Sequence, residues 1–137
     1  MDGGEKKIQK AYESILNHDF EQAIEWFEKA VQEQPDNADF HYKLSITYAR
    51  SNKLGQAVDH AEKALKLDPE REKYKLHFGH LQSRVYVKEA EKYLDMKTQL
   101  HNAVAMLNKA VSLDPLAVDA FVLLGTANTE LGQYKEA

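Results

Sequence analysis

Apolar residues recur along this chain with the spacing of one face of a helix, in runs that are separated by short polar breaks. The clearest run lies between residues 44 and 65 and is interrupted at 51–53, where Ser-Asn-Lys carries no apolar side chain. The pattern predicts two antiparallel helices of about 12 to 14 residues each. The apolar face consists of Leu44, Tyr48, Leu54, Ala57, Ala61, Ala64 and Leu65.

A similar phrase occurs three times. It reads FEKAVQEQP at 27–35, AEKALKLDP at 61–69 and LNKAVSLDP at 107–115. Each phrase contains a Lys-Ala pair and ends in proline. A second alanine stands at the same distance before each proline, and the first two prolines, Pro35 and Pro69, define a period of about 34 residues. Such a period indicates stacked repeats, because one helix pair cannot bury its apolar face without neighbours.

The Asp-Pro pairs at 68–69 and 114–115 are expected to begin the helices that follow them. An aspartate can cap the first turn of a helix with its side chain. A proline at the first helical position gives up no hydrogen bond that the helix would otherwise make. We therefore predict that each of these pairs closes one repeat and starts the next.

These spacings resemble the tetratricopeptide repeat (TPR) family, whose helix–turn–helix unit of about 34 residues combines small and aromatic residues and ends in proline. The resemblance covers nearly the whole chain and implies an all-α fold, a right-handed α-α superhelix or solenoid of antiparallel helix pairs. We expect a single TPR domain over residues 1–137, with repeats at 4–37, 38–71 and 72–117 and a partial fourth repeat at 118–137. The second repeat matches best, through Leu44, Tyr48, Leu54, Ala57, Ala64 and Pro69.

The third repeat contains an insertion, which makes it longer than the period by about 12 residues. Phe78-Gly79 matches the Leu-Gly of a first helix, and Ala103 matches the alanine of the second helix. The two positions are separated by about twice the distance that separates them in the second repeat. The added segment has no glycine or proline, which predicts a first helix over about 72–94, a turn near 95–98 and lengthened helices in this repeat. An apolar stripe on the extension either packs on the repeat's own lengthened second helix or forms a protruding finger that contacts a partner. The stripe consists of Tyr86, Ala90, Tyr93 and Leu94.

The fourth repeat is expected to be incomplete. Its last residues, GQYKEA, match only the first turn of a second helix, so that Phe121, Leu124 and Tyr134 would lack the helix that normally covers them. We therefore predict that the chain is a fragment of a longer repeat protein. Its exposed C-terminal end could stack on another copy and give a homo-oligomer.

Composition narrows the possible functions. The chain is 43% hydrophobic and 29% charged, which is typical of a soluble globular protein. Its net charge of −4 argues against nucleic-acid binding, which needs a basic surface, and the lack of cysteine excludes disulfides and thiolate metal sites. No run approaches the roughly 20 apolar residues of a membrane span, and MDGGEKKIQK has no apolar core of a signal peptide. We expect a cytoplasmic protein without membrane insertion.

No catalytic motif is found in the sequence. It contains no phosphate-binding loop, no Gly-x-Ser-x-Gly, no His-Glu-x-x-His and no Gly-x-Gly-x-x-Gly. This predicts a protein that is not an enzyme and that uses no cofactor. His77 and His80 are close enough along one helix to share a metal, but no third ligand is evident, so we interpret both as ordinary groove-facing histidines and expect no metal site.

In the TPR family the first helices line a concave groove that grips peptides, and the resemblance implies the same use here. The middle of this groove would be basic, which favours an acidic segment with apolar anchors as the partner. Alternatively, the basic side chains of the groove, Lys43, Arg50, Lys73 and Arg84, only keep the concave wall soluble. The predicted partner-binding residues are Tyr12, Tyr42, Lys43, Ile46, Arg50, Lys73, Leu76, His77, His80 and Arg84.

Some family members hold the C-terminal carboxylate of a chaperone with a set of polar residues. The corresponding positions here are Ile8, Tyr12, Lys43, Lys73 and His77, and only Lys73 matches, so we do not predict a chaperone-tail receptor. The expected function is a non-catalytic scaffold that binds a protein segment and assembles a complex. The alternative is a structural protein that assembles with itself into homo-oligomers.

Overall fold

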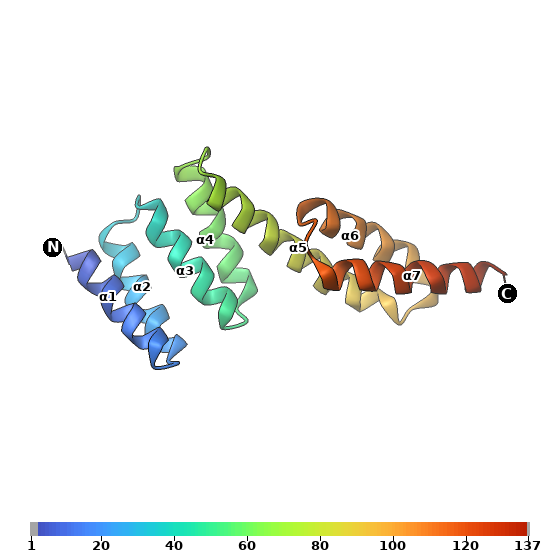
Figure 1. Ribbon diagram of the computed structural model, residues 1–137, viewed down its shortest axis with the longest axis horizontal. Coiled ribbons are helices and arrows are strands. Elements are labelled where there is room, and N and C mark those ends of the chain that lie inside the picture. The colour runs from blue at the N-terminus through green and yellow to red at the C-terminus, as the bar shows by residue number, and fades with distance from the viewer. Residues whose placement is uncertain (1–2, 137) are drawn as a thin grey trace. The chain divides into compact units, whose positions relative to one another are not determined.

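A computed structural model describes residues 3–136, with side chains described as far as residue 133. Within this range every regular element is a helix (Figure 1), which confirms the all-α helical-repeat fold. The chain divides into two compact units, Met1–Phe78 and Gly79–Ala137. The helices are α1 (Gly3–Leu16), α2 (Phe20–Glu33), α3 (Ala38–Arg50), α4 (Leu54–Leu67), α5 (Glu72–Leu94), the 3-10 turn η1 (Lys97–Gln99), α6 (Leu100–Leu113) and α7 (Val118–Glu136). No helix among the described residues is both long and apolar enough to cross a bilayer.

The first unit contains the antiparallel pairs α1/α2 and α3/α4 (Figure 1). The predicted break at residues 51–53 is the turn between α3 and α4. Ala23 and Ala57, which stand at the same distance before the first two prolines, have no exposed surface. They lie in the core with the large side chains of Phe27 and Leu44. A methyl side chain at these positions lets two helix backbones approach closely while the larger residues fill the remaining space.

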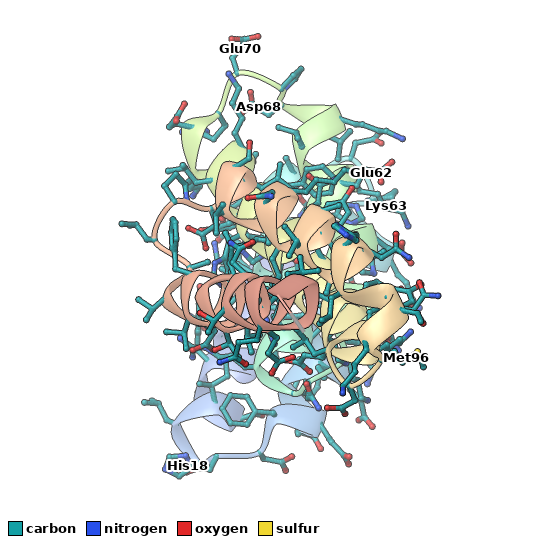
Figure 2. All side chains as sticks on the ribbon, turned by 90° about the vertical axis from the view of Figure 1, so that its right-hand side faces the viewer. His18, Glu62, Lys63, Asp68, Glu70 and Met96 are labelled. Atoms are coloured by element: carbon teal, nitrogen blue, oxygen red, sulfur yellow. The ribbon has the colours of Figure 1, made fainter. Side chains whose placement is uncertain are left out.

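The Asp-Pro pairs do not begin the following helices as predicted. Asp68 and Asp114 instead end α4 and α6, where their backbone N–H groups donate to the carbonyl oxygens of Ala64 and Ala110. Each next helix starts shortly after the proline, at Glu72 and at Val118. Proline cannot continue the helix that has just ended, so its common place is just beyond the C-cap. Figure 2 shows Asp68 in this connection between α4 and α5, next to Glu70.

A polar cluster joins α2, α3 and α4 inside the first unit. The buried His41 lies with its Nε2 2.7 Å from the carbonyl oxygen of Pro35 and its Nδ1 3.0 Å from Nδ1 of His60. The His60 ring stacks on the rings of His41 and Tyr48, and the Tyr48 hydroxyl donates to Glu28. Burial, followed by the neighbouring His41, lowers the pKa of His60 to about 4. His60 is therefore neutral at pH 7 and packs, partly buried, between the rings of His41 and Tyr48.

Helix α5 has the bounds that the sequence predicts, and the border between the two units falls within it, between Phe78 and Gly79. The insertion lengthens only this helix and the connection after it. Helix α6 is no longer than α2 and α4, so the predicted lengthening of the second helix is wrong. Met96, half exposed, marks the α5–α6 connection (Figure 2).

The second unit pairs α6 with the later part of α5. The hydroxyl of Ser83 donates to the carbonyl oxygen of Ala110 over 2.9 Å, and a Cβ on Gly79 would lie 3.2 Å from the carbonyl oxygen of Leu113. Glycine thus permits close approach at the C-terminal end of α6. The equivalent hydroxyl bond in the second repeat joins Ser45 to the carbonyl oxygen of Ala57, which is much nearer along the chain. Helix α6 therefore pairs with a later segment of α5 than the repeat pattern predicts.

Continuing this antiparallel pairing places Ala90, and not Gly79, opposite Ala103. Both alanines are fully buried, and they share one apolar cluster with Leu107 of α6 and Ala127 of α7. The rest of the predicted stripe is partly buried against the same cluster, which rules out a protruding finger and confirms packing within the unit. These partly buried stripe residues are Tyr86, Tyr93 and Leu94.

Helix α7 differs from the prediction. It continues through Gly132 to Glu136 without the turn that was expected to start a second helix. No further helix packs back on α7 in the part of the chain that the structure describes. Phe121 is half exposed and Leu124 is partly buried, whereas the side chain of Tyr134 lies outside the described residues.

The packing of the extension can be tested by enlarging Ala90. We expect Ala90→Leu to lower the free energy of unfolding by about 1–3 kcal/mol, because extra methylenes would have to enter a filled core. The matched control is Ala105→Leu on the exposed face of α6, which should change it by less than about 0.5 kcal/mol. Urea unfolding followed by circular dichroism measures both, and equal small effects would contradict the buried position of Ala90.

Candidate functional site

The centre of the candidate site is Asp39, in the first turn of α3. Helix N-termini favour a carboxylate because the backbone N–H dipoles point toward it. Lys43, one turn later, donates to Oδ2 of Asp39, while Lys73 donates to Oδ1 over 3.1 Å and the Tyr74 hydroxyl donates to Oδ1 over 3.3 Å. One carboxylate therefore joins α3 to the start of α5. We refer to Asp39, Tyr42, Lys43, Lys73, Tyr74 and His77 as the Asp39 cluster.

The repeat period creates this cluster. Lys73 follows Asp39 by one full period, and His77 follows Lys43 by the same interval. Stacked repeats place equivalent positions of successive first helices beside each other. A negative side chain in one repeat therefore meets a positive one at the same position in the next.

Aromatic rings surround the charges. The ring centroid of Tyr42 lies 5.0 Å from that of Tyr74 and 5.2 Å from that of His77, with the His77 ring edge-on. Nζ of Lys73 lies 5.0 Å from the Tyr42 centroid and 5.5 Å from the Tyr74 centroid, in the range of cation–π attraction. The Lys73 ammonium is thus held by one carboxylate and two aromatic rings.

The protonation states follow from these contacts. Burial would raise the pKa of Asp39, but the hydrogen bonds from Lys43 and Lys73 outweigh it and hold that pKa below the ordinary value. Burial would lower the pKa of Lys43, but Asp39, with a smaller contribution from Tyr12, raises it. Burial and the adjacent Asp39 raise the pKa of Tyr74 to about 12, so its hydroxyl remains a neutral donor. At pH 7 the two lysines and Asp39 carry a combined charge of +1.

The two histidines that the sequence singles out have different partners. Nε2 of His77 lies 2.8 Å from the hydroxyl of Ser45, which donates its own proton to the Ala57 carbonyl and so accepts from His77. Nδ1 of His80 lies 2.7 Å from Oδ2 of Asp114 in the second unit. Among the described residues, no three His, Cys, Asp or Glu side chains are placed to hold a metal ion.

Eight of the ten predicted partner-binding residues lie in the first unit, and His80 and Arg84 lie in the second. Tyr12 and Leu76 are exposed, Arg50 is exposed at the end of α3, and Ile46 is partly buried. The structure brings Tyr42, Lys43, Lys73 and His77 together around Asp39. Their use in partner binding stays a prediction.

Asp39 and Tyr74 are absent from the ten predicted residues, although the repeat register already places Asp39 on the concave face beside Tyr42 and Lys43. The signal for Asp39 was available, because it stands one helical turn before Lys43 and one repeat period before Lys73. Its contacts also reduce the positive charge that the sequence predicts for this face. Lys43 and Lys73 share one negative partner and are not two free cations.

The pairing of Asp39 can be tested through its titration. We expect its carboxyl pKa, followed by carbon-detected NMR, to lie below the ordinary value of 3.8. Lys73→Gln should raise this pKa because it removes one of the two ammonium groups that hold the proton off. Lys88→Gln, at a position of α5 in the second unit, should leave it unchanged. A pKa of Asp39 that does not respond to Lys73→Gln would contradict the shared ion pair.

Comparison with known proteins agrees with this architecture. Residues 14–77 match the sequence model of the tetratricopeptide repeat. No curated protein matches the sequence significantly. Several solved structures share the fold at low identity.

The MamA protein superposes with a TM-score of 0.61 at 18% identity, over 97% of this chain and 85% of that chain. The first TPR domain of Spaghetti (RPAP3), solved with the HSP90 peptide SRMEEVD, gives 0.56 at 16% identity, over 94% of this chain and 93% of that chain. The Sgt2 TPR domain from Aspergillus fumigatus gives 0.56 at 16% identity, over 100% and 84%. Residues 14–77 therefore match the tetratricopeptide repeat, and the chain as a whole shares the fold of solved TPR domains.

Proposed function

We propose that this chain is a non-catalytic protein-interaction module that binds a peptide segment on the face formed by α1, α3 and the start of α5. The observation that carries this proposal is the Asp39 cluster, in which a half-exposed Lys73 lies beside the partly buried Tyr42 and Lys43 and the buried Tyr74. The Lys73 side chain is 47% exposed, and Tyr12, which interacts with Lys43, is 45% exposed. Such a combination offers both apolar contact area and charged donors to a partner.

The chemistry of the cluster favours a partner segment that carries a carboxylate next to an apolar residue. Each lysine ammonium has three N–H donors, and Asp39 accepts one from each. The remaining donors of Lys73 can reach an acceptor on the ligand, while the exposed Leu76 and Tyr12 can pack on an apolar side chain. The RPAP3 domain, which has the same fold, is solved with a peptide that contains acidic residues and methionine, and this supports the proposal.

A peptide-display selection tests this function. Peptides are selected on the unchanged chain and then assayed against Lys43→Glu/Lys73→Glu and against the matched control Lys88→Glu/Lys97→Glu, whose lysines lie in the second unit. We expect the selected peptides to contain acidic and apolar residues and to bind the first variant at least about tenfold more weakly, because two attractive charges become repulsive.

Circular dichroism and melting temperature establish that both variants are folded, and Lys73→Glu alone replaces the first variant if the double change unfolds the protein. Selected peptides that bind the first variant as well as they bind the control would overturn the proposal, because the cluster would then not be the binding site.

A second candidate function is self-assembly, and one observation favours it. The α6–α7 junction and the start of α7 expose several large apolar side chains, with Leu116 87% and Phe121 49% exposed. Proteins that remain monomeric rarely expose large contiguous apolar patches. Two further apolar side chains at the start of α7 are exposed, Val118 and Val122.

Sedimentation equilibrium separates the two functions. Peptide binding as the main function predicts a single species of 15.7 kDa at every concentration, because nothing in the first unit requires a second copy. Self-assembly predicts an average mass that rises with concentration and that returns to 15.7 kDa in Phe121→Lys/Val122→Lys. The second result would place self-assembly ahead of peptide recognition.

A further inference from the structure

We infer that Asp39 is a built-in competitor for the ligand's carboxylate and thereby determines how acidic a segment this face accepts. The inference rests on the proposed function and names a specificity-determining residue for it. The Asp39 carboxylate occupies the position between the two ammonium groups that an acidic side chain of a partner would otherwise take.

The geometry of the carboxylate carries this step. Its two oxygens are divided between the two lysines, with Lys43 on Oδ2 and Lys73 on Oδ1, and Tyr74 also donates to Oδ1. Both ammonium groups of the cluster therefore contact Asp39. An incoming carboxylate must share the lysines with Asp39, and it experiences repulsion from the Asp39 charge while it does so.

This ion pair is more sheltered than an ordinary surface pair. The side chains of Lys43 and Asp39 are 25% and 35% exposed, whereas those of Lys66 and Glu62, at the same spacing on α4, are 75% and 45% exposed. Solvent and salt screen charges less where the side chains are less exposed. The negative charge of Asp39 should therefore act on a bound ligand, while that of Glu62 should not.

A difference in charge selectivity follows. With Asp39 in place, the two lysines and Asp39 attract a ligand with a combined charge of +1, so a second acidic residue adds little to the affinity. Without the Asp39 charge, the same two lysines attract it with +2, and each acidic residue adds more. The unchanged face is thus suited to a segment with one carboxylate beside an apolar residue, and it gains little from further acidic residues.

The experiment is a cycle of two peptides and two proteins. One peptide from the display selection is synthesised with a single glutamate and with two adjacent glutamates, and fluorescence anisotropy gives the Kd of each on the unchanged chain and on Asp39→Asn. We expect the second glutamate to improve binding about three- to tenfold more on Asp39→Asn than on the unchanged chain. Glu62→Gln, which removes the carboxylate of the exposed pair on α4, should behave as the unchanged chain does.

Each other outcome is decisive. An equal effect of the second glutamate on both proteins would overturn the role of Asp39, while the loss of binding in Lys43→Glu/Lys73→Glu would still support peptide recognition. A selection that yields no binding peptide on any of the proteins would overturn the proposed function and this inference with it. Asp39→Ser replaces Asp39→Asn if the latter does not fold. If neither folds, a second glutamate that improves binding to the unchanged chain more than about tenfold overturns the inference.

Discussion

The close approach of neighbouring helices at buried alanines is the constraint on which the other features of this protein depend. Ala23, Ala57 and Ala103 have no exposed surface, and each lies where two helix backbones meet. A larger side chain at such a position would force the helices apart or strain the core. Because this contact recurs at the repeat period from Ala23 to Ala57, equivalent residues of successive first helices lie side by side in the first unit. The Asp39 cluster is a direct result of that arrangement.

The same constraint explains the long helix α5. A second helix needs a small residue opposite its own alanine, and Ala90 supplies that residue for Ala103 of α6. The first turns of α5 are then left to the first unit, where Lys73, Tyr74 and His77 interact with α3. One helix thus contributes to the Asp39 cluster through its start and to the core of the other unit through its end.

The charges of the candidate site show why side chains of one sign cannot simply be counted. Lys43 and Lys73 give the sequence the appearance of a basic groove, yet both contact Asp39 in the structure. Tyr42 and Tyr74 add aromatic faces that attract the Lys73 ammonium independently of any carboxylate. The candidate site is therefore a network of one anion, two cations and aromatic rings in which each charge has a partner.

The sequence by itself determined the helical repeats, the break at 51–53 and the bounds of α5, because these depend on local periodicity, helix propensity and the spacing of alanine and proline. It did not determine the pairing of α5 with α6, since an uninterrupted helix contains no local signal of which of its small residues, Gly79 or Ala90, faces Ala103. It predicted a break before the end of α7 that the structure does not have, and it did not reveal the partners of Asp39. Only the tertiary structure decided the pairing of α5 with α6 and the partners of Asp39, because these depend on contacts between residues that packing, and not chain neighbourhood, brings together.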